Sequence, residues 1–185
     1  MKRLVLAAVL LAPAYLATPP AAGAQAAPDA DLARRVQLLE DRAALKALVD
    51  TFSVLADRKD VPRQVLLFTE DATVESRVGA APGITLRGRE QIGGAFAPFL
   101  AQFSTVYHMN GQHAVTIDGD RATGTLYTLV VLVGAQNGRT VRQTMGVTYD
   151  DEYVRRGGRW LIAKRTSHFT WTDQTPVPAP APPAR

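Results

Sequence analysis

Two of the three histidines in this chain, His108 and His113, lie in one short stretch, Ser104–Ile117, rich in β-branched and aromatic residues. That composition predicts a β-strand. A neutral imidazole takes up a proton near physiological pH, which other side-chain types do only when their pKa is shifted. His108 is therefore the first candidate for a general base. His113 comes five residues later, so a regular strand would turn it to the opposite face, unless a bulge at Asn110–Gly111 reverses this. We interpret His113 as structural.

The two ends of the chain read as segments outside the folded domain. Residues 1–26 combine a short basic start, an apolar run at Leu4–Leu16 and small residues of the A-x-A type around Ala24. This pattern is typical of a secretory signal peptide, and the run is too short for a membrane anchor. Residues 174–185 alternate proline with small residues, which predicts an extended, solvated tail. We therefore expect an exported protein, periplasmic or secreted, with one domain at residues 29–173.

Composition narrows the classes of function. The chain has no cysteine, which excludes disulfides and thiolate metal ligands. A zinc site from His108, His113 and His168 would have the right ligand type but no recognisable spacing, so we expect neither a metal nor a cofactor. Without Lys2 and Arg3, 19 basic residues stand against 17 acidic ones, and the two signs are interspersed. Nucleic-acid binding is therefore not expected.

Hydrophobic periodicity predicts helices first and strands afterwards. Helical spacing covers residues 32–57, a short helix is expected at 63–68, and a third helix begins at Gly88. Strands are expected at 72–78 and 84–86 and then at 105–117, 122–133, 141–154 and 160–172. Asp118-Gly119, Asn137-Gly138 and Gly157-Gly158 separate the last four and are hairpin signals. This order predicts an α+β fold with a mostly antiparallel sheet.

Some of these strands carry apolar residues on both alternations, as residues 127–133 show. Such strands usually have both faces covered. A strongly curved sheet that wraps the long helix would satisfy this requirement. Its inner face would line a pocket, and its outer face would be available for a homodimer.

Several short motifs in a fixed order link this chain to a known family. They are residues 56–60 (ADRKD), 67–72 (LFTEDA), 88–90 (GRE), 115–122 (VTIDGDRA) and 149–160 (YDDEYVRRGGRW). Together they resemble the SnoaL-like branch of the nuclear-transport-factor-2-like superfamily, over about residues 36–171. The resemblance implies a cone of curved sheet around a long N-terminal helix with two shorter helices. It leaves enzymes, binding modules and enzyme subunits open, because this fold hosts all three.

Two enzyme types of this branch, scytalone dehydratase and hexachlorocyclohexane dehydrochlorinase, use an aspartate–histidine pair. The resemblance places Asp57 and His108 at those two positions, and it matches Arg165 to an arginine of the dehydrochlorinase pocket. In such chemistry the carboxylate orients the imidazole, which abstracts a proton, while the arginine stabilises the developing negative charge. The resemblance thus implies a cofactor-independent lyase or isomerase-like enzyme with these three catalytic residues.

Other positions depart from the related enzymes. Ala56 stands where the dehydratase has a tyrosine, and Phe52 stands where the dehydrochlorinase has a lysine. Residues 129–133 lack the second pocket histidine of the dehydratase. Ser76 replaces the base aspartate of the steroid isomerases with this fold. The resemblance therefore predicts a type of chemistry and transfers neither specific activity.

The expected ligand is a small, largely apolar molecule. If Arg165 faces inward, strand alternation turns Leu161, Ala163, Ser167, Phe169 and Trp171 inward too. The candidate substrate-binding residues are Phe52, Tyr127, Tyr149, Phe169 and Trp171, with either tyrosine able to supply a hydroxyl. Simpler roles stay open, since Asp57 could bond local backbone and Arg165 could lie on the surface. A non-catalytic ligand-binding or assembly module of the cell envelope is the alternative function.

Overall fold

A computed structural model describes residues 26–79 and 83–177 of the 185-residue chain. The expected signal peptide, apart from its last residue, and most of the expected tail lie outside these residues. The chain divides into two compact units, residues 1–36 and 37–185. In the first unit the described residues, 26–36, are helical. No helix within the described ranges is both long and apolar enough to cross a membrane.

The first helix, α1 (Ala26–Asp57), has the amphipathic spacing expected from the sequence. Leu45, Leu48, Val49 and Phe52 are buried at the i, i+3, i+4, i+7 spacing of one helix face, and they join the hydrophobic core. Helix α2 (Val61–Gln64) follows α1 and leads directly into a short 3₁₀ helix, η1 (Val65–Leu67). The third α-helix, α3 (Gly88–Ala101), comes later in the chain. The strong apolar period of α1 therefore made its C-terminal half predictable.

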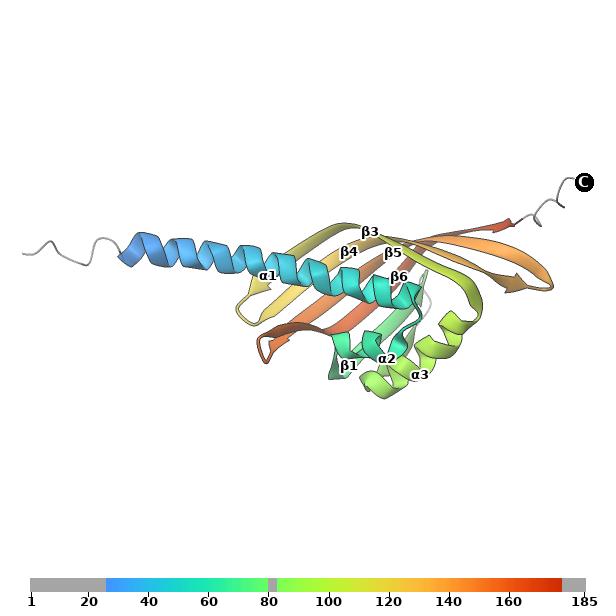
Figure 1. Cartoon of the computed structure of the whole chain (residues 1–185), viewed down its shortest axis with the longest axis horizontal. Helices are drawn as coiled ribbons and strands as arrows, with labels where there is room; N and C mark the ends of the chain where they lie inside the picture. The colour runs from blue at the N-terminus through green and yellow to red at the C-terminus, as the bar shows by residue number, and fades with distance from the viewer. Residues whose placement is uncertain (1–25, 80–82, 178–185) are drawn as a thin grey trace, which may run out of the picture. The chain divides into compact units, whose positions relative to one another are not determined.

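Six strands form one mixed sheet: β1 (Phe68–Val78), β2 (Ile84–Arg87), β3 (Phe103–Asp118), β4 (Arg121–Gln136), β5 (Arg139–Arg156) and β6 (Arg159–Pro176). Their order is β2-β1-β6-β5-β4-β3, and every neighbouring pair is antiparallel except β1 and β6 (Figure 1). Asn137 and Gly138 have positive φ values at one hairpin, and Gly157 and Gly158 do so at another. These backbone conformations favour asparagine and glycine, which explains why the hairpins were visible in the sequence. The predicted α+β class is confirmed.

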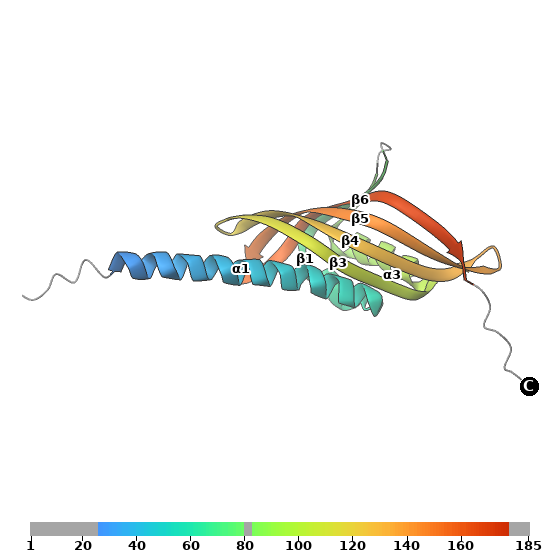
Figure 2. The same ribbon diagram turned by 90° about the horizontal axis from the view of Figure 1, so that it is seen from above.

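One face of the sheet contacts the C-terminal half of α1, and we call it the inner face. Figures 1 and 2 show a twisted, curved sheet that does not close on itself. The core on the inner face joins α1, α3 and the central strands through residues such as Phe68, Ile92 and Leu126. Four aromatic rings meet there edge to face, with Phe52 against Phe68, Phe96 and Tyr149.

Register shifts decide which side chains reach the inner face. On β3, the three steps from Asn110 to His113 face only two steps on β4, from Thr128 to Leu126, which is a β-bulge. On β6, similar shifts lie between Ile162 and Lys164 and between Phe169 and Trp171. Each bulge reverses the simple alternation of side chains along its strand.

Candidate functional site

The end of α1 places Asp57 opposite strand β3. The amide of Lys59 donates to the carbonyl of Ala56, and the amide of Asp60 donates to that of Leu55. This pair of bonds is a Schellman motif, and Lys59 takes the positive φ that it requires. Because these backbone groups end the helix at Asp57, the carboxylate of this last helical residue is free to contact the sheet.

That carboxylate contacts His108 directly. Oδ1 of Asp57 lies 2.7 Å from Nδ1 of His108, between residues 51 positions apart in the sequence. The His108 side chain is only 8% exposed, whereas that of Asp57 is 25% exposed. A carboxylate at Nδ1 favours the tautomer with its proton on Nδ1, which leaves the lone pair of Nε2 available as a base.

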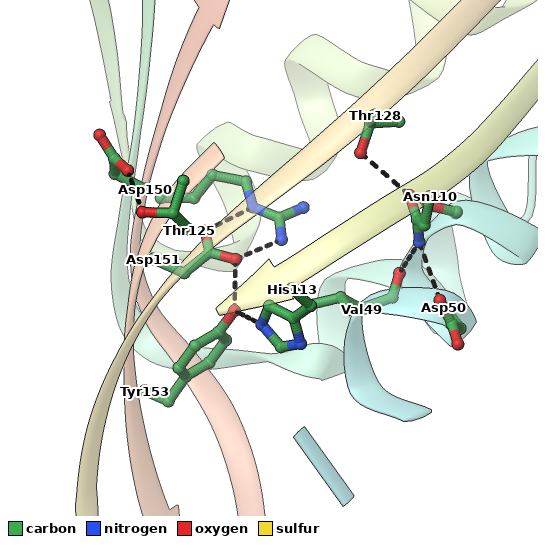
Figure 3. Close-up of polar contacts among 11 residues, drawn as sticks. Val49, Asp50, Asn110, His113, Thr125, Thr128, Asp150, Asp151 and Tyr153 are labelled. Carbon is green, nitrogen blue, oxygen red and sulfur yellow. Dashed lines mark hydrogen bonds and ion pairs between the residues drawn. The ribbon is translucent and has the colours of Figure 1, made fainter. Parts of the chain in front are cut away.

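Asn110 fastens β3 to α1 next to this pair. Its Nδ2 donates to the Val49 carbonyl at 3.2 Å and to Asp50 Oδ1 at 3.0 Å. Its Oδ1 accepts from the hydroxyls of Ser53 and Thr128, each at 3.0 Å. These four bonds, two of which Figure 3 shows towards α1, hold the strand two residues beyond His108 against the helix. Asn110 therefore helps to set the distance between Asp57 and His108.

Arg165 lies on the inner face but pairs with a carboxylate. Its Nε and Nη2 donate to the two oxygens of Asp151 at 2.8 and 2.6 Å, and both side chains are fully enclosed. The guanidinium also stacks 4.3 Å from the ring centres of Phe52 and Tyr149. Burial alone would lower the pKa of Arg165, but the ion pair with Asp151 outweighs it and raises that pKa. Arg165 is thus permanently charged, and its charge is matched.

The hydrogen bonds of Arg165 to Asp151 leave out its third nitrogen, Nη1. Nη1 is buried and makes no hydrogen bond among the described residues. A buried donor of this kind costs free energy unless something accepts from it. It is the one part of Arg165 that could still bind a ligand atom.

The sheet register sets Arg165 well away from His108. Along β3, the inward side chains come in the order His108, Asn110, His113 and Val115. Across β4 and β5, the last of these aligns with Gly124 and Asp151, and Asp151 is paired with Arg165. Three steps of two residues separate the backbone positions by about 20 Å along the strand direction, although the guanidinium of Arg165 reaches back to Phe52 and Tyr149. The structure therefore brings Asp57 and His108 together and leaves Arg165 in a separate polar group.

His113 belongs to that second group. The hydroxyl of Tyr153 donates to Asp151 Oδ2 at 2.8 Å, and Nε2 of His113 lies 3.0 Å from the same hydroxyl (Figure 3). Burial raises the pKa of Tyr153, and the Asp151 carboxylate raises it further. Burial also lowers the pKa of His113 below its ordinary value. The bulge after Asn110 thus puts His113 on the inner face, in contrast to a regular strand.

The expected lining residues divide between the two faces. Phe52 and Tyr149 are buried on the inner face, and Phe169 packs against the core from β6. Tyr127 and Trp171, 56% and 51% exposed, lie on the outer face instead. For Trp171 the cause is the bulge after Phe169, which aligns it with Gly146. The other bulge of β6, between Ile162 and Lys164, means that Leu161 and Ala163 no longer follow the alternation of side chains that starts from Arg165.

Two surface grooves lie away from the Asp57–His108 pair. One, of about 450 Å³, is lined by residues of α1 and the β5–β6 hairpin, including Asp41, Arg155 and Trp160. Arg155 binds both oxygens of Asp41 at 2.7 Å, and the indole of Trp160 donates to Asp41 at 3.2 Å. The other, of about 470 Å³, lies over threonine-rich strands of the outer face. His168 is also on that face, 3.1 Å from Asp150, and within the described residues no three acidic or histidine side chains form a metal cluster.

Sequence reasoning did not single out Asn110, Asp151 or Tyr153. Asp151 is the middle one of three consecutive acidic residues in the run Tyr149–Tyr153. Strand alternation between two tyrosines was the available signal, because it puts Asp151 on the same face as both. Asn110 was visible only as a site of a bulge.

The SnoaL-like domain family matches residues 37–166 of this chain. The chain belongs to that family. An uncharacterized protein of Mycobacterium tuberculosis is 29% identical over 127 residues, which cover 69% of this chain and 84% of that protein. The predicted membership of the SnoaL-like branch is therefore confirmed.

Solved structures show the same SnoaL-like fold. A candidate scytalone dehydratase from Novosphingobium aromaticivorans superposes with a TM-score of 0.66 and 20% identity, covering 82% of this chain and 98% of that one. A type 3 hexachlorocyclohexane dehydrochlorinase from Novosphingobium barchaimii gives a TM-score of 0.64 and 20% identity, covering 80% and 99%. At these identities the likeness shows that the chain has the nuclear-transport-factor-2-like fold.

Proposed function

We propose that this protein is a cofactor-independent lyase or isomerase-like enzyme that acts on a small, largely apolar molecule. The observation that carries the proposal is the 2.7 Å contact between Asp57 Oδ1 and His108 Nδ1. An imidazole oriented by a carboxylate is a frequent arrangement for general-base catalysis. Two solved structures with the same fold are described as a candidate scytalone dehydratase and a dehydrochlorinase, which supports this class of reaction.

In the proposed reaction, Nε2 of His108 takes a proton from a carbon of the substrate. The C–H bond breaks, the N–H bond forms, and the electron pair of the C–H bond becomes part of a new double bond. In an elimination the leaving group departs with its own bonding pair. In an isomerisation the imidazolium returns the proton to a different carbon. Asp57 accepts a hydrogen bond from Nδ1–H of His108 throughout, keeps its negative charge and so stabilises the imidazolium.

The role of Arg165 in this proposal is narrower than the sequence implied. Its bidentate bond to Asp151 forms a pair without net charge, so it does not offer an unmatched cation to a departing anion. Nη1 can still donate a hydrogen bond. We therefore give Arg165 no part in the catalytic step, which we place at His108 and Asp57.

A non-catalytic ligand-binding module is the second candidate. The observation that favours it is the packing of Phe52 against Phe68, Phe96 and Tyr149, which fills part of the inner face with aromatic rings. Phe99 does not add to this packing, because it is 48% exposed. A binding module would lose affinity on substitution of these rings and would be indifferent to His108.

The test compares His108→Gln and Asp57→Asn with the unchanged chain, on a substrate found by screening uncharged compounds for elimination and isomerisation. His168→Gln is the matched control, because His168 lies on the outer face. Loss of turnover in the first two variants and retention in the third supports the enzyme. Equal turnover in all four proteins would exclude His108 and Asp57 as the catalytic pair.

We further propose that the protein is exported and forms a homodimer. Export is supported by the signal-peptide pattern of residues 1–26. The dimer is supported by large side chains exposed on the outer face, namely Tyr107, Met109, Tyr127 and Trp171. In the register, Met109, Leu129, Gly146 and Trp171 form one continuous row across four strands. Exposed apolar patches of this kind commonly mark interfaces.

A further inference from the structure

His113 is a titratable group that the proposed catalytic step does not use. It shares the inner face with His108 only because of the β3 bulge between Asn110 and His113. A bulge interrupts ladder bonds and is often retained where it re-aims a side chain. Here the re-aimed side chain is an imidazole joined to a buried ion pair through Tyr153.

The hydrogen bonds in this group fix which nitrogen of His113 carries the proton. Asp151 is ionised beside Arg165, so it can only accept. The hydroxyl of Tyr153 therefore gives its single proton to Asp151, and its oxygen can only accept from His113. Nε2 of His113 must be the protonated nitrogen. In a neutral imidazole, Nδ1 then carries the lone pair.

That lone pair is free to bind something else. No hydrogen bond to Nδ1 of His113 is formed among the described residues. The side chain of His113 is partly exposed, and its Nδ1 is not among the fully buried atoms. Tyr153, Asp151 and Arg165 hold the ring of His113 through a chain of hydrogen bonds. An acceptor nitrogen fixed in this way is suited to accept a hydrogen bond from a ligand.

We propose that His113 is a specificity residue whose Nδ1 accepts a hydrogen bond from a hydroxyl group of an uncharged ligand. Tyr153 and Asp151 are positioning residues, because they set the tautomer and the ring orientation of His113. The proposal deepens the proposed function and rests on it for the ligand's place on the inner face. It adds a hydroxyl-bearing compound, an alcohol or a phenol, as the chemical class.

The charged groups around His113 decide how this acceptor depends on pH. Lys46 and Asp50 face it from α1, Asp151 and Tyr153 from β5, and Arg165 from β6, while β4 contributes the apolar Leu126. Burial and the two cations lower the pKa of His113, and the two carboxylates oppose them. The acceptor is therefore present at neutral pH and is lost as the pH falls through the pKa of His113.

The test observes the imidazole nitrogens directly by nuclear magnetic resonance of the ¹⁵N-labelled full chain. Phenol is the probe, and toluene is the matched compound of similar shape without a donor. We expect His113 to show the Nε2–H tautomer. Phenol should then shift the Nδ1 resonance of His113, while toluene leaves it unchanged. The phenol-dependent shift should disappear at acidic pH as Nδ1 takes a proton.

Substitutions test whether the selective binding of phenol depends on His113. His113→Gln should weaken phenol binding about fivefold relative to toluene, the effect of losing one hydrogen bond. His168→Gln should leave both affinities unchanged. Tyr153→Phe should remove the tautomer preference of His113 while the ring remains. If Tyr153→Phe does not fold, the His113→Gln affinities still decide the question.

Three results would overturn the proposal: a proton on Nδ1 of His113 at neutral pH, equal shifts with phenol and toluene, or unchanged selectivity in His113→Gln. None of these measurements depends on turnover. In His108→Gln the phenol-dependent shift of His113 should persist, so that failure of this proposal and failure of the proposed catalytic step are distinguished.

Discussion

Nδ1 of His108 lies 2.7 Å from Oδ1 of Asp57, and a Schellman motif ends α1 at that aspartate. The helix end and the strand therefore fix both partners through backbone structure. Replacing Asp57 by asparagine keeps the size of the side chain but removes its charge. With a substrate in hand, we expect Asp57→Asn to lower kcat by about two to four orders of magnitude, because the imidazolium loses its counter-charge.

The effect of Asp57→Asn on His108 can also be measured without a substrate. An asparagine amide can donate to Nδ1 of His108, which would move the imidazole proton to Nε2. Nitrogen resonances of the imidazole should therefore report opposite tautomers in the two proteins. A variant with the original tautomer and undiminished turnover would contradict the assigned role of Asp57.

Removing one partner of the enclosed Asp151–Arg165 pair should destabilise the fold more than replacing both partners together. Removing one partner leaves the other charged and buried, so Asp151→Asn or Arg165→Met should each lower the free energy of unfolding by about 3–5 kcal/mol. Replacing both, as Asp151→Leu with Arg165→Met, should cost less than either single change, because no unpaired charge remains. Urea unfolding of the three variants gives the comparison. A double variant as unstable as the sum of the singles would show that the pair is not coupled.

His113 should make stability depend on pH. Its pKa is lowered in the folded protein, mainly by burial, whereas the unfolded chain has the ordinary value of about 6.5. The unfolded state therefore binds a proton first, and stability is complete above about pH 6.5 and is lost as the pH falls towards the folded pKa. Urea unfolding at pH 7.5 and 5.5 should show this loss in the unchanged chain and a smaller loss in His113→Gln. Identical pH dependence of the two proteins would contradict the prediction.

Trp171 covers Gly146 on the outer face. A Cβ atom at Gly146 would lie 2.1 Å from Nε1 and 2.5 Å from Cε2 of the indole, so the ring would have to move. We expect Gly146→Ala to lower the free energy of unfolding by about 1–3 kcal/mol, the range for overpacking. Gly94→Ala is the control, because its Cβ meets nothing within 4 Å. In a Trp171→Ala background the cost of Gly146→Ala should largely disappear, and a cost that persists would point to a different cause.

The proposed homodimer can be tested on the same face. Tyr127→Glu would put a charge into the exposed apolar patch, and light scattering coupled to size exclusion should then show the mass of a monomer. Thr123→Glu, also exposed on β4, should leave the dimer intact. If the unchanged chain has the mass of a monomer at all concentrations, the proposed homodimer is wrong.

The parts of the fold that were predictable from the sequence have local causes. Helical spacing of apolar residues marked the buried side of α1, and asparagine or glycine at positive φ marked two of the hairpins. The parallel pairing of β1 with β6 could not be found in this way. The two strands are separated by 80 residues, 79–158, and nothing in either one encodes its distant neighbour.

At the candidate site, the limit of sequence reasoning was strand alternation. A strict period of two predicted that Trp171 would face inward with Arg165, and the bulge after Phe169 turned it outward. A bulge adds one residue without a strong composition signal, so that every later side chain changes face. The partner of Arg165 was missed for a different reason. Asp151 lies between two other acidic residues, and only the fold distinguishes the enclosed one from its solvated neighbours.

The bulge of β3 also bears on which changes in chain length this protein can absorb. Three steps of β3 span two steps of β4 there, so one residue between Asn110 and His113 is surplus to the ladder. Losing the codon for Gln112 would leave Asn110 and His113 two steps apart and still on the same face. Losing a codon between His108 and Asn110 would instead expel one of the two from the interior. Length variation in this strand should therefore be tolerated at residues 111–112 and excluded just before them.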